Sequence, residues 1–573
     1  TITLVALFFP IVFMDGTTGR LFREFSIVVS GSVIISSFAA LTFTPMLATK
    51  LLIKREQQSW FYRKTEPFFE GMNRVYSQSL AAFLKRRWIA LPFTIVTILL
   101  IGVLWNTIPA EMAPLEDRSQ ISINTMGAEG VTYEYIRDYT EDINHLVDSI
   151  IPDAEAVTAR VSSGSGNVRI TLKDMKDRDY TQMEVAEKLS KAVQKKTMAR
   201  SFVQQSSSFG GRRGGMPVQY VLQATNIEKL QEVLPKFMTK VYENPVFQMA
   251  DVNLKFSKPE ARININRDKA SIMGVSTKNI AQTLQYGLSG QRMGYFYMNG
   301  KQYEILGEIN RQQRNKPADL KGIYIRSDNG NMVQLDNLIE LTGGIAPPKL
   351  YRYNRFVSAT ISAGLADGKT IGQGLDEMDK IAKETLDETF RTALTGDSKE
   401  YRESSSSLMF AFILAIVLIY LILAAQFESF KDPLIIMLTV PLAIAGALVF
   451  MYFGDITMNI FSQIGIIMLI GLVAKNGILI VEFANQKQEA GEDKMRAIKD
   501  ASLQRLRPIL MTSASTILGL IPLAYATGEG CNQRIAMGTA VVGGMLISTL
   551  LTMYIVPAIY SYVSTNRSKL KTE

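Results

Sequence analysis

The run GIIMLIGLVAKNGILIVEFANQ, residues 465–486, decides the fold because it is a long apolar segment with one cation near its centre. A bilayer is spanned by about 20 mostly apolar residues, and residues 460–484 form a stretch of that kind. The cation is Lys475, and a charge at that depth costs about 2.5 to 3.5 kcal/mol. We therefore expect carboxylates to hold Lys475 in its charged form. No acidic residue lies near the middle of the other apolar stretches, so these partners are predicted to lie upstream of Thr1.

Further apolar stretches of spanning length lie on both sides of a long charged region. Together with residues 460–484 they predict a membrane α-helical bundle of about seven transmembrane helices. A shorter apolar stretch, residues 4–14, is expected to be the remnant of one more. The other stretches are residues 25–52, 88–108, 408–425, 433–453, 508–526 and 535–563.

Lysine and arginine concentrate in two short connections of the predicted bundle, residues 50–87 and 487–507. Because basic loops stay on the cytoplasmic side of a membrane, both connections are predicted to be cytoplasmic. The large insert, residues 109–404, is then extracytoplasmic. Within the first connection an apolar face predicts an amphipathic helix, which lies either along the inner interface or against the bundle. This face consists of Phe69, Met72, Tyr76, Leu80 and Phe83.

The composition argues against several classes of function. One cysteine and one histidine, His145, provide neither a disulfide framework nor a thiolate or imidazole metal cluster. The net charge of +9 comes from basic residues beside apolar runs, which argues against nucleic-acid binding. The run GLADGKT, residues 364–370, is one residue short of a phosphate loop. We expect no cofactor, and protons suffice as the coupling ion.

The hydrophobic pattern of the insert predicts an α/β fold with split βαβ units, which is typical of ferredoxin-like subdomains. Alternation over residues 293–305 surrounds Asn299 and Gly300 and predicts a hairpin, because both central residues of a type I′ turn need positive φ. The predicted strands are residues 119–126, 157–161, 167–172 and 218–224, and the predicted helices are 133–150, 180–195, 227–242 and 371–389.

An internal repeat relates the start of the chain to its end. A shift of 512 positions superposes the two pairs of residues Pro10 and Pro522, and Gly31 and Gly543. Four more identities share this ungapped register, namely Gly16 with Gly528, Ile35 with Ile547, Ser36 with Ser548 and Pro45 with Pro557. The chain is therefore predicted to be half of a tandem-duplicated transporter.

Polar side chains also recur at helical spacing next to Lys475. Glu482 follows it by seven residues, and Arg505 and Thr512 show the same spacing in the next helix. A hydroxyl inside the membrane can orient or relay a proton. The alternatives are a Lys475 that snorkels, an interfacial Arg505 and a Thr512 bonded to its own helix.

At these residues the chain resembles the resistance-nodulation-division (RND) efflux pumps of the hydrophobe/amphiphile branch, the AcrB-like proteins of Gram-negative bacteria. The resemblance covers the whole chain, as its C-terminal half. It rests on GLVAKNGILIVEFANQ (471–486), RLRPILMTSAST (505–516), LAAQFESFKDP (423–433), PAEMAPLED (109–117) and GTAVVGGM (538–545).

The resemblance implies a secondary transporter, not an enzyme, in the inner membrane, which expels amphiphilic small molecules in exchange for protons. It also implies a homotrimer, a periplasmic adaptor protein and an outer-membrane channel. The implied segments are two last helices of a first repeat (1–52), a cytoplasmic amphipathic segment (53–87), a transmembrane helix (88–108), a periplasmic region (109–404), five transmembrane helices (405–563) and a tail (564–573). The periplasmic region divides into porter subdomains at 120–215 and at 216–267 plus 351–397, with a docking portion at 268–350.

The same resemblance implies particular site residues. Lys475, Asn476, Arg505 and Thr512 match the proton-relay motifs, and the paired aspartates of the family belong to the other half. Around residues 161–172 drug pumps of this type carry aromatic residues, whereas this chain has VSSGSG between two arginines. The substrate-binding candidates are Arg160, Arg169 and Phe209, the last in a Gly-rich run (206–217) that is either an entry loop or a linker. The docking hairpin would present Tyr295, Tyr297, Asn299 and Gly300.

Other functions remain open from the sequence. The same fold could export lipids or metal ions, and a metal exporter would require Met175, Met216 and Met293 to converge. A non-transporting sensor or translocation accessory would instead bind a partner protein through residues such as Tyr295 and Tyr297.

Overall fold

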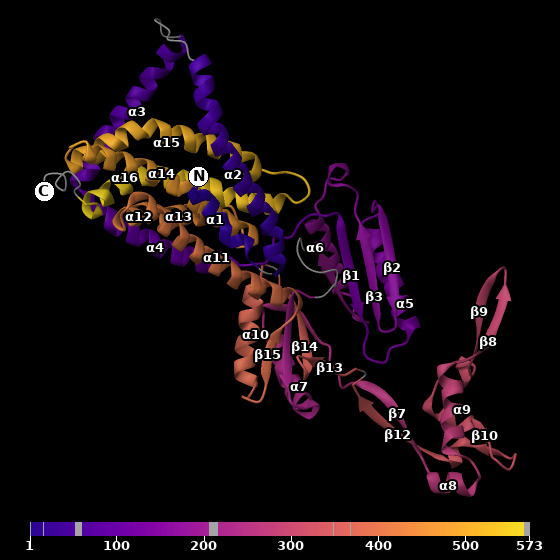
Figure 1. Ribbon diagram of the computed structural model, residues 1–573. Coiled ribbons are helices and arrows are strands. Elements are labelled where there is room, and N and C mark those ends of the chain that lie inside the picture. Colours follow the sequence, from indigo (N-terminus) through magenta and orange to yellow (C-terminus); the bar gives the residue numbers. More distant parts are fainter. Residues whose placement is uncertain are drawn as a thin grey trace.

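The computed structural model describes residues 2–14, 16–51, 60–205, 216–347, 349–366 and 368–565, which form a helical bundle and an α/β insert (Figure 1). In this part of the chain seven helices are long and apolar enough to cross a membrane, as the sequence predicts. A shorter apolar helix, α1 (Ile2–Val12), precedes them. The bundle helices are α2 (Gly16–Leu51), α4 (Ala90–Thr107), α11 (Gly396–Phe427), α12 (Lys431–Met437) with α13 (Thr439–Phe453), α14 (Ile460–Glu489), α15 (Lys494–Ala524) and α16 (Cys531–Val563).

Small residues let α16 approach its neighbours closely. A Cβ on Gly543 would lie 2.4 Å from the side chain of Phe450 on α13, and one on Gly544 would lie 2.1 Å from Leu469 on α14. Helices in membranes associate largely through such close packing. The centre of the bundle is therefore the contact of α13, α14 and α16.

The helix α3 (Trp60–Lys85) packs its apolar face on α15 and α16. Tyr76 and Leu80 are buried, and the Tyr76 hydroxyl donates a hydrogen bond of 2.6 Å to the carbonyl of Met553. The structure thus shows packing of α3 against the bundle, and a position along the inner interface stays a prediction.

Residues paired by the internal repeat occupy similar places. Pro10 and Pro522 lie inside α1 and α15. Gly16 at the start of α2 and Gly528 before α16 have positive φ angles of 82° and 86°. Both therefore take a backbone conformation that favours glycine, at the turn between two helices.

The first subdomain of the insert is a four-stranded antiparallel sheet in the order β2-β3-β1-β4. Both of its helices bury apolar residues against the same face, which includes Ile121, Ile123, Val168 and Ile170. No helix among the described residues of this subdomain covers the other face. In chain order the elements are β1 (Gln120–Met126), α5 (Tyr133–Ile150), β2 (Ala156–Ser162), β3 (Ser165–Thr171), α6 (Gln182–Val193) and β4 (Arg200–Gln205).

The second subdomain combines two separate stretches of chain in one five-stranded sheet. The strand β14 (Phe356–Leu365) pairs with β5 (Val218–Ala224) and β6 (Phe247–Val252), and β15 (Arg391–Leu394) pairs with β5. Tyr351–Tyr353 forms the edge strand β13. The helices are α7 (Ile227–Glu243) and α10 (Ile371–Thr385). The second helix was expected to reach residue 389, but Thr385 is followed by a turn into β15.

The third part of the insert lies beyond a two-stranded ribbon of β7 (Lys258–Ile265) and β12 (Ile339–Ala346) (Figure 1). This pairing corrects the predicted boundary at residue 267, because β7 joins the ribbon and not the five-stranded sheet. The predicted hairpin is present as β8 (Gln291–Met298) and β9 (Lys301–Gly307), with φ of 52° at Asn299 and 71° at Gly300. The remaining elements include α8 (Arg267–Ile272), α9 (Thr277–Ser289), β10 (Tyr324–Arg326) and β11 (Met332–Gln334).

Candidate functional sites

Asn476, near the middle of α14, is buried and donates hydrogen bonds to two other helices. Its Nδ2 atom lies 3.2 Å from Ser513 Oγ on α15 and 3.4 Å from Thr549 Oγ1 on α16. Thr549 Oγ1 also donates to Ser513 Oγ at 3.2 Å. We call these residues the three-helix polar cluster. Because a polar group among apolar helices is stable only when it is hydrogen-bonded, the cluster holds α14, α15 and α16 in register.

Lys475 precedes Asn476 but lies on another side of α14, since consecutive residues turn by about 100° around a helix. Its side chain is exposed, and no carboxylate within the described ranges forms an ion pair with its ammonium. The expectation that its partners come from another segment therefore stays a prediction.

The other two relay candidates make different contacts. The guanidinium of Arg505 lies 4.3 Å from the ring centre of Phe483, and its buried Nε has no hydrogen-bond partner among the described residues. The Thr512 hydroxyl donates to the carbonyl of Ile509 at 3.1 Å. Thr512 thus bonds to its own helix, and Ser513 makes the contact between helices. In the described structure no hydrogen bond or ion pair joins the four candidates into one network.

A second buried polar network lies toward the C-terminal end of α14. Asn485 Nδ2 donates to a carboxylate oxygen of Asp432 at 3.1 Å, and Asp432 is only 2% exposed. The Tyr560 hydroxyl donates to Asn485 Oδ1 at 2.5 Å and accepts from Gln488 Nε2 at 2.6 Å. Sequence reasoning missed both this network and the roles of Ser513 and Thr549. Asp432 does lie in the quoted run LAAQFESFKDP, but its burial depends on the packing of α12 against α14 and α16.

The helix-free face of the first sheet carries both predicted arginines. One row across the four strands consists of Arg160, Asn167, Asn124 and Phe202, each directly opposite the next. Arg169 lies in the adjacent row, on the same face, because residues two apart on a strand share a face. The structure therefore brings Arg160 and Arg169 to one surface, which we call the binding face. Phe209 lies outside the described residues.

Amide side chains join the strands of the binding face. Asn167 Nδ2 donates to Asn124 Oδ1 at 2.7 Å, and Asn124 Nδ2 donates to Gln204 Oε1 at 2.8 Å. Beside this ladder is a cavity of about 220 Å³, which Arg160 and Phe202 help to line. The cavity thus offers a cation and amides next to one aromatic ring, a surface suited to an amphiphile with a polar end.

The hairpin exposes an aromatic surface. Tyr297 is 76% exposed and Tyr295 is 43% exposed, on a strand that, among the described residues, pairs only with the other strand of the hairpin. Phe296 stacks on Tyr303 with ring centres 5.2 Å apart. These aromatic side chains are exposed in the described structure, and the docking role of the hairpin stays a prediction.

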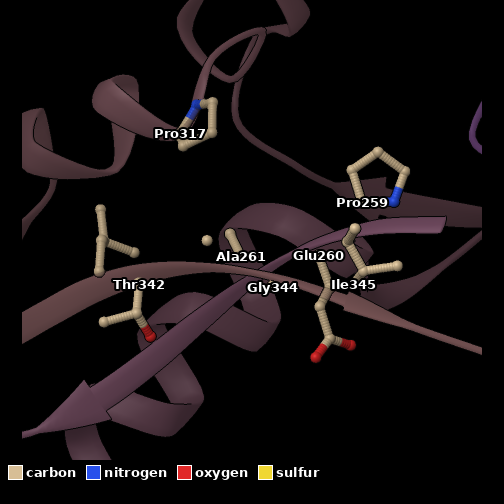
Figure 2. A pocket seen from close by; sticks show the side chains of 9 residues that line it. Pro259, Glu260, Ala261, Pro317, Thr342, Gly344 and Ile345 are labelled. Carbon is tan, nitrogen blue, oxygen red and sulfur yellow. The ribbon is translucent and has the colours of Figure 1, made fainter. Parts of the chain in front are cut away.

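A second cavity lies beside the β7–β12 ribbon, and Glu260 is the one titratable residue among the described residues that line it (Figure 2). The cavity has a volume of about 550 Å³ and is lined otherwise by small and apolar residues and one threonine. Glu260 pairs with Arg262 Nε at 2.6 Å. Within the described ranges no group of three His, Cys, Asp or Glu side chains is placed to hold a metal ion.

Two comparisons with known proteins agree on the kind of protein. The sequence profile of the AcrB/AcrD/AcrF family matches residues 1–564. A protein of Haemophilus influenzae, named as an uncharacterized transporter, is 31% identical over 580 residues, which is 100% of this chain and 56% of that protein. The chain therefore spans about half the length of this curated relative.

Proposed function

Since the chain belongs to the AcrB/AcrD/AcrF family of transporters, we propose that it is the C-terminal half of an exporter that expels amphiphilic small molecules in exchange for protons. It is a multi-pass membrane protein, and the proposal places it in the inner membrane of a Gram-negative bacterium. The α/β insert would lie in the periplasm. The working assembly would be a homotrimer that contacts a periplasmic adaptor and an outer-membrane channel.

The observation that carries the proposal is the position of Lys475 beside the three-helix polar cluster. The ammonium lies on a side of α14 where a carboxylate of another segment can approach it. Protonation of that carboxylate would remove the attraction that holds Lys475. Asn476 then passes the displacement of α14 to α15 and α16, because it is hydrogen-bonded to both.

The substrate class follows from the binding face. Arg160 and Arg169 would hold a polar or anionic head group, and Phe202 would contact the apolar part of the molecule. A face built only of aromatic residues would suit flat cationic drugs better. We therefore propose anionic amphiphiles as preferred substrates.

Three finer features belong to the same proposal. The order β1-α5-β2-β3-α6-β4, with both helices on one face, supports a ferredoxin-like first subdomain. The matching prolines and positive-φ glycines at both ends of the chain support a tandem duplication. The hairpin with Tyr295 and Tyr297 supports a docking role toward a second copy or the channel.

Transport by the intact protein in proteoliposomes tests the proposal. With an imposed pH gradient, export of tritiated taurocholate, an anionic amphiphile, should depend on the gradient. Lys475→Ala should abolish that dependence, and Lys475→Arg should keep part of it because the cation remains. Lys499→Ala, which removes a cation from α15, serves as the control. Undiminished gradient-dependent export by Lys475→Ala would refute the mechanism.

A further inference from the structure

Residues 109–117 lead from α4 to β1 and contact, in order, the start of α14, the start of α16 and the first sheet. We call them the connecting segment. They are the run PAEMAPLED that carries part of the family resemblance. The connecting segment is more than a linker, because both helices that it contacts carry a residue of the three-helix polar cluster.

The connecting segment first forms a short backbone ladder with the residues before α14. The Met458 amide donates to the Pro109 carbonyl at 2.8 Å, and the Glu111 amide donates to the Met458 carbonyl at 3.0 Å. The Ile460 amide then donates to the Met112 carbonyl at 3.2 Å. The Thr457 hydroxyl donates to the Glu111 carboxylate. The segment therefore moves with the N-terminal end of α14.

Its next contact is with the first turn of α16. Asn532 Nδ2 donates to the Leu115 carbonyl at 2.7 Å, and the Gln533 amide donates to Glu116 Oε1 at 2.9 Å. A carboxylate is favoured there because the N-terminus of a helix carries partial positive charge. Glu116 is only 1% exposed, and within the described ranges its Oε2 has no hydrogen-bond partner. A buried carboxylate oxygen without a hydrogen-bond partner is uncommon in folded proteins.

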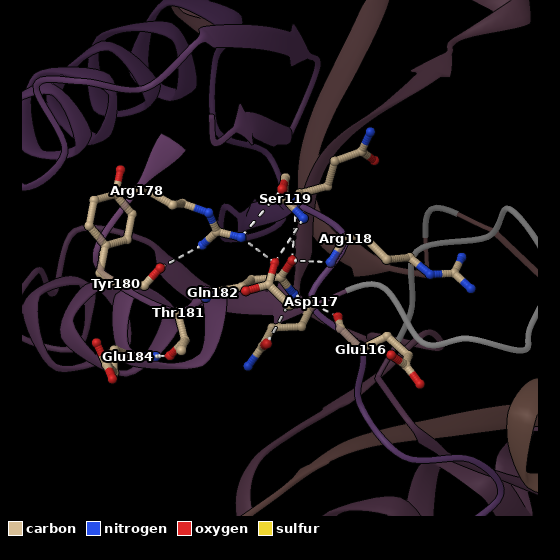
Figure 3. A network of polar contacts seen from close by, with 11 residues as sticks. Glu116, Asp117, Arg118, Ser119, Arg178, Tyr180, Thr181, Gln182 and Glu184 are labelled. Atoms are coloured by element: carbon tan, nitrogen blue, oxygen red, sulfur yellow. Dashed lines mark hydrogen bonds and ion pairs between the residues drawn. The ribbon is translucent and has the colours of Figure 1, made fainter. Parts of the chain in front are cut away.

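The last contact fixes the segment to the base of the first sheet (Figure 3). Asp117 forms an ion pair with Arg178, whose side chain is fully buried, and accepts the Gln182 amide at 2.8 Å. The Gln182 side chain in turn accepts the amides of Arg118 at 2.9 Å and Gln120 at 3.1 Å. These bonds join the start of α6 to the start of β1, and both elements belong to the subdomain that carries the binding face.

Glu116 thus contacts α16 through its side chain, and the next residue, Asp117, contacts the first subdomain. On one side, α16 carries both Gln533 and Thr549, about 24 Å apart along a continuous helix. On the other side, Asp117 is covalently next to Glu116 and is held by Arg178 and by the amide of Gln182 at the start of α6. A displacement of α16 at the three-helix polar cluster can therefore reach the first subdomain through the two hydrogen bonds to Leu115 and Glu116 and the peptide unit between Glu116 and Asp117.

We propose that Glu116 is a positioning residue that couples the movement of α16 to the binding face during transport. This role rests on the proposed function. Coupling requires a side-chain oxygen at residue 116 that accepts a hydrogen bond from the Gln533 amide, because the first turn of α16 offers a backbone N–H donor there. Substrate binding itself does not need this contact, because no atom of Glu116 belongs to the binding face.

The test uses the intact transporter in proteoliposomes, with tritiated taurocholate as the probe and an internal dye that reports pH. Three quantities are measured, namely the dissociation constant of taurocholate, its transport rate and the proton flux that it stimulates. Glu116→Ala should lower the transport rate by about tenfold, as expected for loss of a hydrogen bond to a charged group. The dissociation constant should stay within about twofold of wild type, because Glu116 does not belong to the binding face and a coupling defect lowers the rate without weakening binding.

Two further variants separate coupling from folding. Glu116→Gln keeps an oxygen that accepts from Gln533 and should restore the transport rate to within about twofold of wild type. Glu529→Ala removes an exposed carboxylate from the same end of α16 and should change neither rate nor binding. The coupling role is overturned if the Glu116→Ala variant loses binding and transport in equal proportion. It is also overturned if this variant transports as fast as wild type. A wild-type protein whose export ignores the pH gradient overturns the proposed function, and the coupling role with it.

Discussion

Lys475 and Asn476 are neighbours in α14, yet Asn476 is buried in hydrogen bonds to α15 and α16 while Lys475 is exposed. The two residues therefore divide two tasks. Asn476 holds three helices of this chain together, and in the proposed mechanism Lys475 responds to a charge from another segment. Substitutions at the two positions should separate stability from transport.

Asn476→Leu should destabilise the protein by about 1 to 3 kcal/mol, because it leaves Ser513 and Thr549 with one donor fewer in an apolar setting. Lys475→Leu, measured on this chain without the carboxylates of the other segment, should leave stability unchanged or raise it, since a cation exposed among apolar helices is costly. Thermal unfolding of both variants in the same detergent measures the difference. Equal melting temperatures for the two variants would contradict the assignment.

Arg160→Gln and Arg169→Gln should each weaken binding of taurocholate, by about tenfold for a hydrogen bond between charged groups. The reason is that both guanidinium groups lie on the binding face. Lys188→Gln is the matched control, because it removes an exposed cation from α6 on the other side of the sheet. Equilibrium binding at two salt concentrations measures the effect. Loss of affinity in Lys188→Gln alone would show that the substrate binds elsewhere.

Glu111 should make stability depend on pH. Burial raises its pKa above the ordinary value of 4.5, and the hydrogen bond from Thr457 offsets part of this shift. A raised pKa in the folded state means that the contribution of Glu111 is present at low pH and is lost as the pH rises through that pKa. Glu111→Gln should therefore be more stable than wild type at neutral pH, and the difference should vanish below pH 4.5. Melting temperatures across this range check the sign, with Glu529→Gln as an exposed control.

The sequence predicts the elements of this fold better than their contacts. Hydropathy locates the seven long apolar helices, because each helix needs about 20 mostly apolar residues of its own to cross a bilayer. Hydropathy does not predict whether Thr512 or Ser513 contacts Asn476, because the contact depends on how α15 is rotated against α14. The two residues are adjacent, and one step around a helix decides which of them faces the cluster.

The binding face shows the same limit in a sheet. Arg160 and Arg169 are close in sequence, but only the pairing of Arg160 with Asn167 places both arginines on one face. A shift of one residue would send one arginine into the apolar layer beneath α5 and α6. The buried position of Asp432 needed tertiary contacts of three helices, for which no local pattern exists.

Gly543→Ala should destabilise the bundle by about 1 to 3 kcal/mol, the usual cost of forcing extra volume into a packed core. The added Cβ would lie 2.4 Å from Phe450 Cβ on α13, so one of the two helices has to move. Gly519→Ala is the matched control, because a Cβ there meets no atom within 4 Å. That control should stabilise α15 by roughly 0.5 to 1 kcal/mol, since alanine has a higher helix propensity than glycine. Thermal unfolding of both variants should therefore give shifts of opposite sign. A rise in melting temperature for Gly543→Ala would show that α13 and α16 are not in close contact at this point.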